Sequence, residues 1–288
     1  MTGGPSDPAG RRRRGGAHSI PAGARSLPQA VATGAALLAV VLLASYLGPE
    51  ASFVLICVVV AVALYEGIDA LTAAGRKPNL WLALVCGLGL LVAAFAQKPS
   101  LFAAVLAAAL YGGFLLALRP GRSSAPASDV AWTLLLVAWI GGGGAAATSL
   151  LVVESGLALL IAFVLIAAAD DIAAFFVGRA LGRRKLAPAI SPGKSWEGFI
   201  GGLAGALAAG AALGGVVDRL GVVHGLALGT ICGLLAPVGD LVESLFKREL
   251  GLKDSGRLLP GHGGVLDRLD AIVFCAPAVY LYVAFVVP

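Results

Sequence analysis

Long apolar runs dominate the chain and alternate with short polar segments. A run of about 20 apolar residues is long enough for a helix to cross the ~30 Å hydrocarbon core of a bilayer. The sequence contains nine runs of roughly this kind, of which the second and the eighth are short: 30–47, 51–65, 80–96, 101–118, 130–147, 150–169, 199–217, 222–238 and 271–287. The pattern predicts an all-α, polytopic membrane protein with about nine transmembrane helices.

Composition supports this class of protein. Hydrophobic residues make up 59% of the 288 residues, charged residues make up 13%, and the mean hydropathy is +0.92. These values exclude a soluble domain built around one core. Residues 1–29 are rich in Gly, Pro, Ser and Arg, so we expect a disordered basic tail there. N-terminal transmembrane helices are expected over 30–150, and a catalytic transmembrane region over 151–288.

The positive charges indicate how the chain is oriented. Cytoplasmic loops of membrane proteins are enriched in Lys and Arg. With the N-terminus inside, 19 of the 21 Lys and Arg residues fall on cytoplasmic segments, and only Lys98 and Arg219 fall outside. We therefore expect a cell-membrane protein whose N-terminus and segment 244–270 face the cytoplasm. The net charge of +5 follows from this topology and from attraction to anionic membrane lipids, so no nucleic-acid partner is expected.

Two polar segments, 169–202 and 239–270, carry the candidate chemistry. In the second, Asp240, Glu243, Ser244 and Lys247 recur at helical spacing and predict a cytoplasmic amphipathic helix with one polar face. Mg²⁺ prefers carboxylate oxygens and commonly shares them with substrate phosphates. A solvated interfacial helix is the alternative for this pattern taken alone.

A glycine-rich loop is predicted after this helix, because Pro260 and the glycines around it cannot continue a helix. Backbone N–H groups of such a loop suit an anion. The cations suited to phosphate oxygens nearby are Lys247, Arg248, Lys253, Arg257 and Arg268. Asp267 and Asp270 share one face of the last helix. This arrangement favours a polyphosphate bound through a divalent metal; a salt-bridged loop that pins two helices is the structural alternative.

The fixed positions of 244–270 form a long signature: Ser244-x-Phe246-Lys247-Arg248-x4-Lys253-Asp254-x-Gly256-x2-Leu259-Pro260-x-His262-Gly263-Gly264-Val265-x-Asp267-Arg268-Leu269-Asp270. The signature resembles that of the phosphatidate cytidylyltransferases, also called CDP-diacylglycerol synthases. The resemblance extends from about Asp170 to the C-terminus. The chain departs from the family pattern after Asp171, where Ile172 and Ala173 replace a small hydroxyl residue and an often-present glycine. Asp170 and Asp171 point about 100° apart on a helix, so we do not expect both to serve one site.

The resemblance implies that CTP and phosphatidate react to give CDP-diacylglycerol and pyrophosphate at the inner membrane surface, with Mg²⁺ as cofactor. A second cation and a homodimer are left open. Implied metal ligands are Asp240 and Asp267, followed by Glu243, Asp270 and Asp171. Implied phosphate-binding residues are Lys247, Arg248, Lys253 and Arg268. His262, Gly263 and Gly264 are implied to contact the triphosphate or the lipid phosphate. Lys194, Ser195 and Glu197 are implied to line the nucleotide site; for Ser195, a helix N-cap is the alternative.

Other interpretations predict different observations. A CTP-dependent polyprenol kinase would release CDP instead of pyrophosphate, and a transporter would carry ionisable residues deep within several spans. Gly193-Lys194-Ser195 is not a P-loop, because Pro188 stands at the position of the first glycine. Glu66 and Asp69 are expected to be solvated at the end of their span. The glycines at 141–144 and the pair Gly201 and Gly205 are expected to allow close helix packing.

Overall fold

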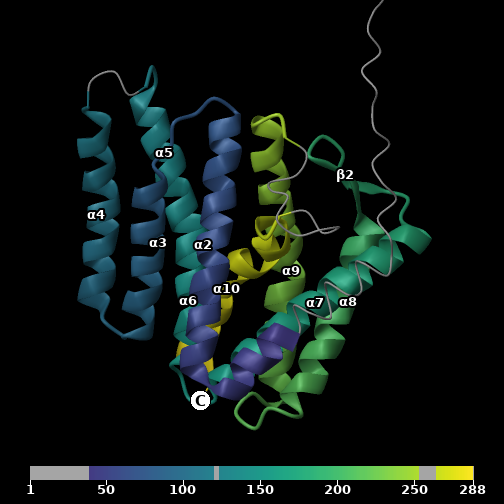
Figure 1. Ribbon diagram of the computed structural model, residues 1–288. Helices are drawn as coiled ribbons and strands as arrows, with labels where there is room; N and C mark the ends of the chain where they lie inside the picture. Colours follow the sequence, from purple (N-terminus) through teal and green to yellow (C-terminus); the bar gives the residue numbers. More distant parts are fainter. Residues whose placement is uncertain (1–38, 120–122, 253–263, 288) are drawn as a thin grey trace, which may run out of the picture.

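The computed structural model describes residues 39–119, 123–252 and 264–287 and consists almost entirely of helices (Figure 1). A helical stretch at 39–47 precedes α2. The following elements are α2 (Pro49–Ala73), α3 (Leu80–Phe95), α4 (Pro99–Ala117), α5 (Pro126–Leu136), the π-helical segment η1 (Val137–Gly141), α6 (Gly142–Leu151), α7 (Gly156–Leu181), β1 (Lys185–Ala187), β2 (Ser191–Ser195), α8 (Trp196–Gly214), α9 (Gly221–Glu249) and α10 (Leu266–Val286).

The predicted all-α, polytopic class is confirmed. Seven helices in the described part of the chain are long and apolar enough to cross a membrane, with α5, η1 and α6 forming one continuous span. An eighth apolar helix, α3, has 16 residues. Only the second half of the predicted first span, 30–47, lies within the described residues, so the count of nine stays a prediction. The expected tail at 1–29 also lies outside them.

Local sequence explains where several helices begin. Pro49, Pro99 and Pro126 stand in the first turns of α2, α4 and α5, where a missing N–H removes no intrahelical hydrogen bond. Asn79 caps α3 by accepting a hydrogen bond from the Leu82 N–H at 3.0 Å. These boundaries are therefore readable from the sequence.

Basic residues concentrate at one end of the bundle. The α2–α3 and α4–α5 connections, the β1–β2 hairpin and the end of α9 lie together at the top of Figure 1. The α3–α4 and α8–α9 connections lie at the opposite end and carry Lys98 and Arg219. The top connections and helix ends carry Arg76, Lys77, Arg119, Arg183, Arg184, Lys185, Lys194, Lys247 and Arg248. Lys and Arg are therefore distributed unevenly between the two ends of the bundle.

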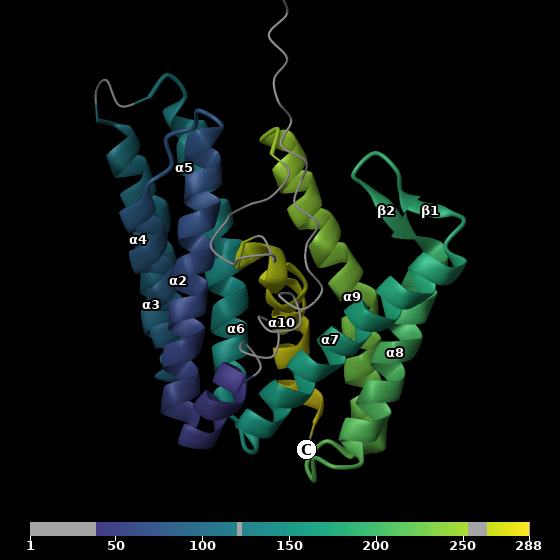
Figure 2. The same cartoon turned by 45° about the vertical axis from the view of Figure 1, so that its right-hand side comes forward.

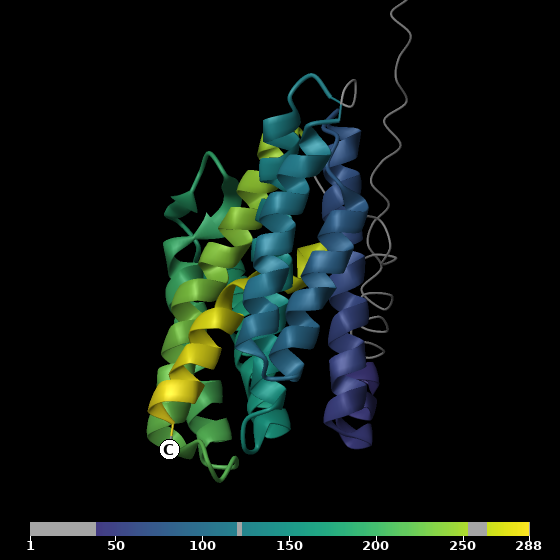
Figure 3. The same ribbon diagram turned by 90° about the vertical axis from the view of Figure 1, so that its left-hand side faces the viewer.

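The helices form two groups with α10 between them (Figure 2). Helices α2 to α6 make one group and α7 to α9 make the other, while α10 packs against both α6 and α9. Figure 3 shows α10 starting well below the top ends of α2 and α9. The first turn of α10, with Asp267 and Asp270, is therefore recessed within the bundle.

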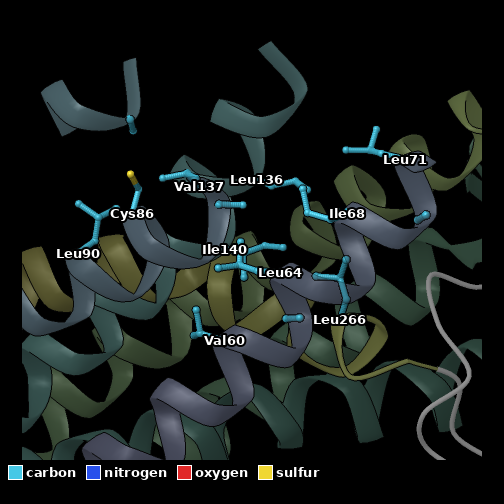
Figure 4. Packing of buried hydrophobic residues seen from close by; sticks show 14 of the residues in the cluster. Val60, Leu64, Ile68, Leu71, Cys86, Leu90, Leu136, Val137, Ile140 and Leu266 are labelled. Carbon is cyan, nitrogen blue, oxygen red and sulfur yellow. The ribbon is translucent and has the colours of Figure 1, made fainter. Parts of the chain in front are cut away.

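Two hydrophobic clusters hold these groups. The first gathers Leu64, Leu136 and Ile140 with Leu266 of α10, as Figure 4 shows, and it includes Phe246 of α9. The second surrounds Phe163 of α7 and reaches α8, α9 and α10. Because Phe246 and Leu266 flank residues 253–263, the N-terminal helices contact the chain on both sides of that segment.

One prediction is corrected within α9. The amphipathic helix expected to start at Asp240 is not a separate element, since α9 runs without a break from Gly221 to Glu249. Its polar face also points inward, because Glu243 is only 2% exposed. The interpretation of this stretch as a solvated interfacial helix is therefore wrong. The two short strands at 185–195 were not predicted either.

Glycines allow the close helix contacts that the sequence predicts, within one chain. A Cβ at Gly201 would lie 2.5 Å from Val177 Cβ, and a Cβ at Gly205 would lie 2.5 Å from Ala173 Cβ. Across α8 and α9, a Cβ at Gly210 would lie 2.2 Å from the Gly225 carbonyl oxygen. At the α6–α10 contact, a Cβ at Gly143 would lie 2.3 Å from the Val273 carbonyl oxygen.

Gly143→Ala is expected to destabilise the protein, because a methyl group cannot fit against the α10 backbone without moving a helix. We expect a loss of about 1–3 kcal/mol, typical of overpacking, seen as a lower midpoint of thermal unfolding in detergent. Gly142→Ala is the matched control, since its Cβ would meet nothing within 4 Å. Helical Ala at 142 should be neutral or stabilising. Equal midpoints for the two variants would contradict the packing argument.

Candidate active site

The β1–β2 hairpin connects α7 to α8 and is tied to the start of α8. Its antiparallel register pairs Lys185 with Ser195. The Ser195 hydroxyl accepts a hydrogen bond from the Gly198 N–H at 3.1 Å, so Ser195 is the N-cap of α8. The Glu197 carboxylate accepts from the backbone N–H groups of Arg183 and Arg184 at 3.0 and 3.2 Å. Glu197 therefore holds the hairpin in place.

Lys194 extends from the hairpin to α9. Its ammonium group forms an ion pair with the Asp240 carboxylate and lies 3.4 Å from the Pro237 carbonyl oxygen. Both side chains are about a quarter exposed, 25% for Lys194 and 29% for Asp240. The contact brings together residues that are 46 positions apart.

A second cluster joins α9 to α10. Lys247 Nζ lies 2.5 Å from Glu243 Oε2 and 2.8 Å from Asp267 Oδ1. The other Asp267 oxygen accepts a hydrogen bond from the Gly264 N–H at 2.7 Å. The three charged side chains are largely buried, with exposed fractions of 16% for Lys247, 3% for Glu243 and 11% for Asp267. One ammonium group thus bridges two carboxylates inside the bundle.

Asp270 lies beside Asp240 where α9 and α10 approach closely. Gly239 permits the approach, because a Cβ there would lie 2.7 Å from the Asp270 carbonyl oxygen. The buried Asp270 carboxyl group is within hydrogen-bonding contact of Asp240. Two carboxyl groups this close repel each other when both are ionised unless a proton or a cation lies near them. The pair is therefore suited to a cation.

The positions of Asp170 and Asp171 differ from a second prediction. Both line the same cavity, although adjacent helical residues were not expected to serve one site. Asp170 is buried against Gly202, where a Cβ would lie 2.7 Å from Asp170 Oδ1. That oxygen has no hydrogen-bond partner among the described residues. Asp171 is the more exposed of the two.

Two adjoining cavities form the candidate site and share Asp171, Lys194 and Asp240 as lining residues. The larger has a volume of about 460 Å³ and combines apolar side chains, among them Phe175 and Phe199, with charged ones. The smaller, of about 340 Å³, is lined only by polar and charged residues. All five predicted metal ligands line this smaller cavity: Asp171, Asp240, Glu243, Asp267 and Asp270.

The other predicted site residues do not all lie together. Lys194 and Arg268 line the smaller cavity, and Lys194 and Ser195 line the larger one. Arg248 lines a third cavity of about 340 Å³ and donates a hydrogen bond from Nε to the Ile190 carbonyl. Gly264 packs against Glu66 of α2. Lys253, His262 and Gly263 lie outside the described residues.

Sequence reasoning predicted Asp171 but missed Ala174, Phe175 and Gly178, which also line the larger cavity on α7. Asp171, Ala174, Phe175 and Gly178 recur at i, i+3, i+4 and i+7 and so share one helix face. Arg179 adds a cation to the same cavity. This periodicity was visible in the sequence, but α7 is apolar on most of its faces, and only packing shows which face is lined by the hairpin.

The arrangement fits a metal that a substrate helps to hold. Within the described ranges, no three His, Cys, Asp or Glu side chains converge into a ready-made metal shell. Mg²⁺ is commonly bound through only one or two carboxylates, with substrate phosphates and water completing the shell. The contact pair Asp240 and Asp270 supplies two carboxyl groups, and Lys194 lies beside them for phosphate oxygens.

These features define a polytopic helical membrane protein whose bundle encloses a cavity lined by carboxylates and basic side chains. A sequence model of the cytidylyltransferase family matches residues 28–286, so the chain belongs to that family.

Three similar proteins carry the name phosphatidate cytidylyltransferase. The protein of Brucella suis biovar 1 is 52% identical over 112 residues, which cover 39% of this chain and 42% of that protein. The Haemophilus influenzae protein is 46% identical over 121 residues, covering 40% and 42%. The Synechocystis protein is 45% identical over 120 residues, covering 41% and 40%. The chain thus spans about two fifths of the length of these relatives.

Proposed function

We propose that the protein is a phosphatidate cytidylyltransferase, which converts CTP and phosphatidate into CDP-diacylglycerol and pyrophosphate. The observation that carries this proposal is the smaller cavity, where carboxylates from α7, α9 and α10 lie beside Lys194 and Arg268. The names of the similar proteins supply the substrate class. A site of mixed charge suits two anionic substrates that repel each other and must be held together.

The proposed reaction needs no strong base in the protein. The second pKa of a phosphate monoester is about 6, so the lipid phosphate is largely dianionic near neutral pH. One of its oxygens attacks the α-phosphorus of CTP. The bond between that phosphorus and the oxygen leading to the β-phosphate breaks, and pyrophosphate leaves with the bonding electrons. The protein positions the reactants and offsets the charge on the leaving group.

Lys194 and Arg268 are the described cations proposed to hold phosphate oxygens, together with Lys247 beside the cavity. Asp240 and Asp270 are the proposed principal metal ligands, with Asp171 next to them. A bound Mg²⁺ would supply positive charge where negative charge develops on pyrophosphate. The role of Asp267 as a ligand stays a prediction: both of its oxygens are engaged, by Lys247 and by the Gly264 N–H, so binding a metal would require sharing one of them.

The site is proposed to face the cytoplasm, where CTP is available. The concentration of Lys and Arg at the end that carries the hairpin supports this orientation. The apolar part of the larger cavity, around Phe175 and Phe199, is suited to the lipid substrate. One substrate would then enter from the membrane and the other from the aqueous side.

A labelling assay tests the reaction. Purified protein in detergent is incubated with Mg²⁺, phosphatidate and CTP labelled at the α-phosphorus, and the lipid fraction and pyrophosphate are measured. We expect label in the lipid and one pyrophosphate for each labelled lipid. Release of CDP with a polyprenol acceptor, without labelled phosphatidate product, would instead indicate a kinase. Absence of both products would contradict an enzymatic role.

A further inference from the structure

Glu66 of α2 is a buried carboxylate that the proposed reaction does not use. The sequence predicts that it is solvated at the end of a span, like Asp69. The structure contradicts this for Glu66, whose side chain is 2% exposed, whereas Asp69 is exposed. A charged side chain is rarely buried this fully without partners. The contacts of Glu66 therefore require an explanation.

Glu66 contacts the start of α10, 200 residues later in the chain. Its Oε2 atom accepts a hydrogen bond from the Leu266 N–H at 2.9 Å. The first N–H groups of a helix have no partner within the helix, and a carboxylate there is also favoured by the helix dipole. Gly264 makes the approach possible, since a Cβ there would lie 2.6 Å from the same oxygen.

This contact is one residue away from the candidate site. Asp267 follows Leu266, and its carboxylate binds both the Gly264 N–H and Lys247. The turn 264–267 is therefore held from two directions, by Glu66 on α2 and by Lys247 on α9. On α9, Phe246 packs edge-on against Trp132 and Trp139, with ring centroids 5.8 and 6.0 Å away. The N-terminal helices thus contact both sides of the α9–α10 junction.

We propose that Glu66 is a positioning residue: by holding the Leu266 N–H, it places the first turn of α10, and with it Asp267 and Asp270, against α9. The effect on catalysis rests on the proposed function, whereas the anchoring of the turn does not. The atom that matters is the acceptor oxygen at the end of a side chain of this length. A residue that keeps that oxygen should therefore keep the arrangement, and a shorter acid should lose it.

Three substitutions separate the acceptor from the charge. Glu66→Gln keeps the length and one acceptor oxygen but removes the charge. Glu66→Asp keeps the charge but withdraws the oxygen by one methylene group. Glu66→Ala removes both. Asp69→Asn is the matched control, because Asp69 is an exposed carboxylate one helical turn further along α2.

Hydrogen–deuterium exchange of the 288-residue protein in detergent measures how firmly the first turn of α10 is held, and it needs no substrate. We expect peptides covering 264–270 to exchange about 10-fold faster or more in Glu66→Asp and Glu66→Ala, as expected when a local hydrogen bond is lost. Glu66→Gln and Asp69→Asn should exchange like the wild type. Because no turnover is involved, this result stands or falls separately from the proposed reaction.

Steady-state kinetics then tests whether Glu66 positions the residues of the candidate site. We expect kcat/KM for CTP to fall about 10-fold to 100-fold in Glu66→Asp, mainly through a higher KM. The variant should still fold, with a lower midpoint of thermal unfolding, because its buried carboxylate loses its hydrogen-bond partner. Glu66→Gln should stay within about 3-fold of the wild type. Three results would overturn the proposal: wild-type exchange in Glu66→Asp, a Glu66→Gln variant as impaired as Glu66→Ala, or failure of Glu66→Asp and Glu66→Ala to fold, which would assign a structural role.

Discussion

Replacing Asp240 with Asn is expected to lower the rate of CDP-diacylglycerol formation by about 100-fold or more, comparable with losing a group that stabilises transition-state charge. Asp240 lines both cavities, pairs with Lys194 and lies in contact with Asp270. An amide of the same shape removes the negative charge from the centre of this arrangement. The loss should be seen in the labelling assay at saturating CTP and Mg²⁺.

The control for Asp240→Asn is Glu249→Gln, which neutralises an exposed carboxylate at the end of the same helix. We expect Glu249→Gln to retain wild-type activity and both variants to elute as folded protein with unchanged helical content by circular dichroism. Asn has nearly the same shape as Asp, and the Lys194–Asp240 pair that is lost is about a quarter exposed, so the fold should tolerate this change. If the Asp240→Asn protein formed product at the wild-type rate, the reaction would not take place at the residues that the two cavities share, Asp171, Lys194 and Asp240.

The second large effect is expected at Lys247. Its ammonium group bridges Glu243 and Asp267, and all three side chains are largely buried. Lys247→Met leaves two buried carboxylates close together without the ammonium group that bridges them, and breaking a buried ion pair in this way costs about 3–5 kcal/mol. We expect a clearly lower midpoint of thermal unfolding, together with loss of activity because Asp267 is no longer held.

Two further variants identify the cause of that loss. Lys77→Met removes an exposed lysine from the α2–α3 connection and should leave the unfolding midpoint unchanged. Combining Lys247→Met with Glu243→Gln removes one charge of each sign and should recover part of the lost stability without restoring activity. A Lys247→Met protein that unfolds at the wild-type temperature would show that the bridge contributes little to stability.

Much of the candidate site could be predicted from local spacing. Asp240, Glu243, Ser244 and Lys247 recur at helical intervals, and they do share a face of α9 that lines or borders the smaller cavity. Asp267 and Asp270 likewise project toward that cavity from one side of α10. Helical periodicity is a property of neighbouring residues, so the sequence is sufficient to predict it. The direction in which the polar face points was not predictable in this way.

Contacts between residues that are far apart along the chain could not be predicted from the sequence. The contacts of Lys194 with Asp240 and of Glu66 with Leu266 depend on which helices pack side by side. Glu66 illustrates the difficulty: a carboxylate at the end of an apolar run has the pattern of a solvated residue, and its burial follows only from the approach of α10 to α2. The same holds for Asp170, which is buried because Gly202 allows α8 to approach α7.

The sequence by itself determined the class of protein, the positions of most helices and the family, because apolar run length, helix-starting prolines and fixed residue spacing are local properties. The tertiary structure alone decided which charges meet. It turned the polar face of α9 inward, joined the hairpin to α9 through Lys194 and brought α2 to the start of α10. The physical reason is that burial and ion pairing depend on which helices pack together, and close glycine contacts such as those of Gly239 and Gly264 set that packing.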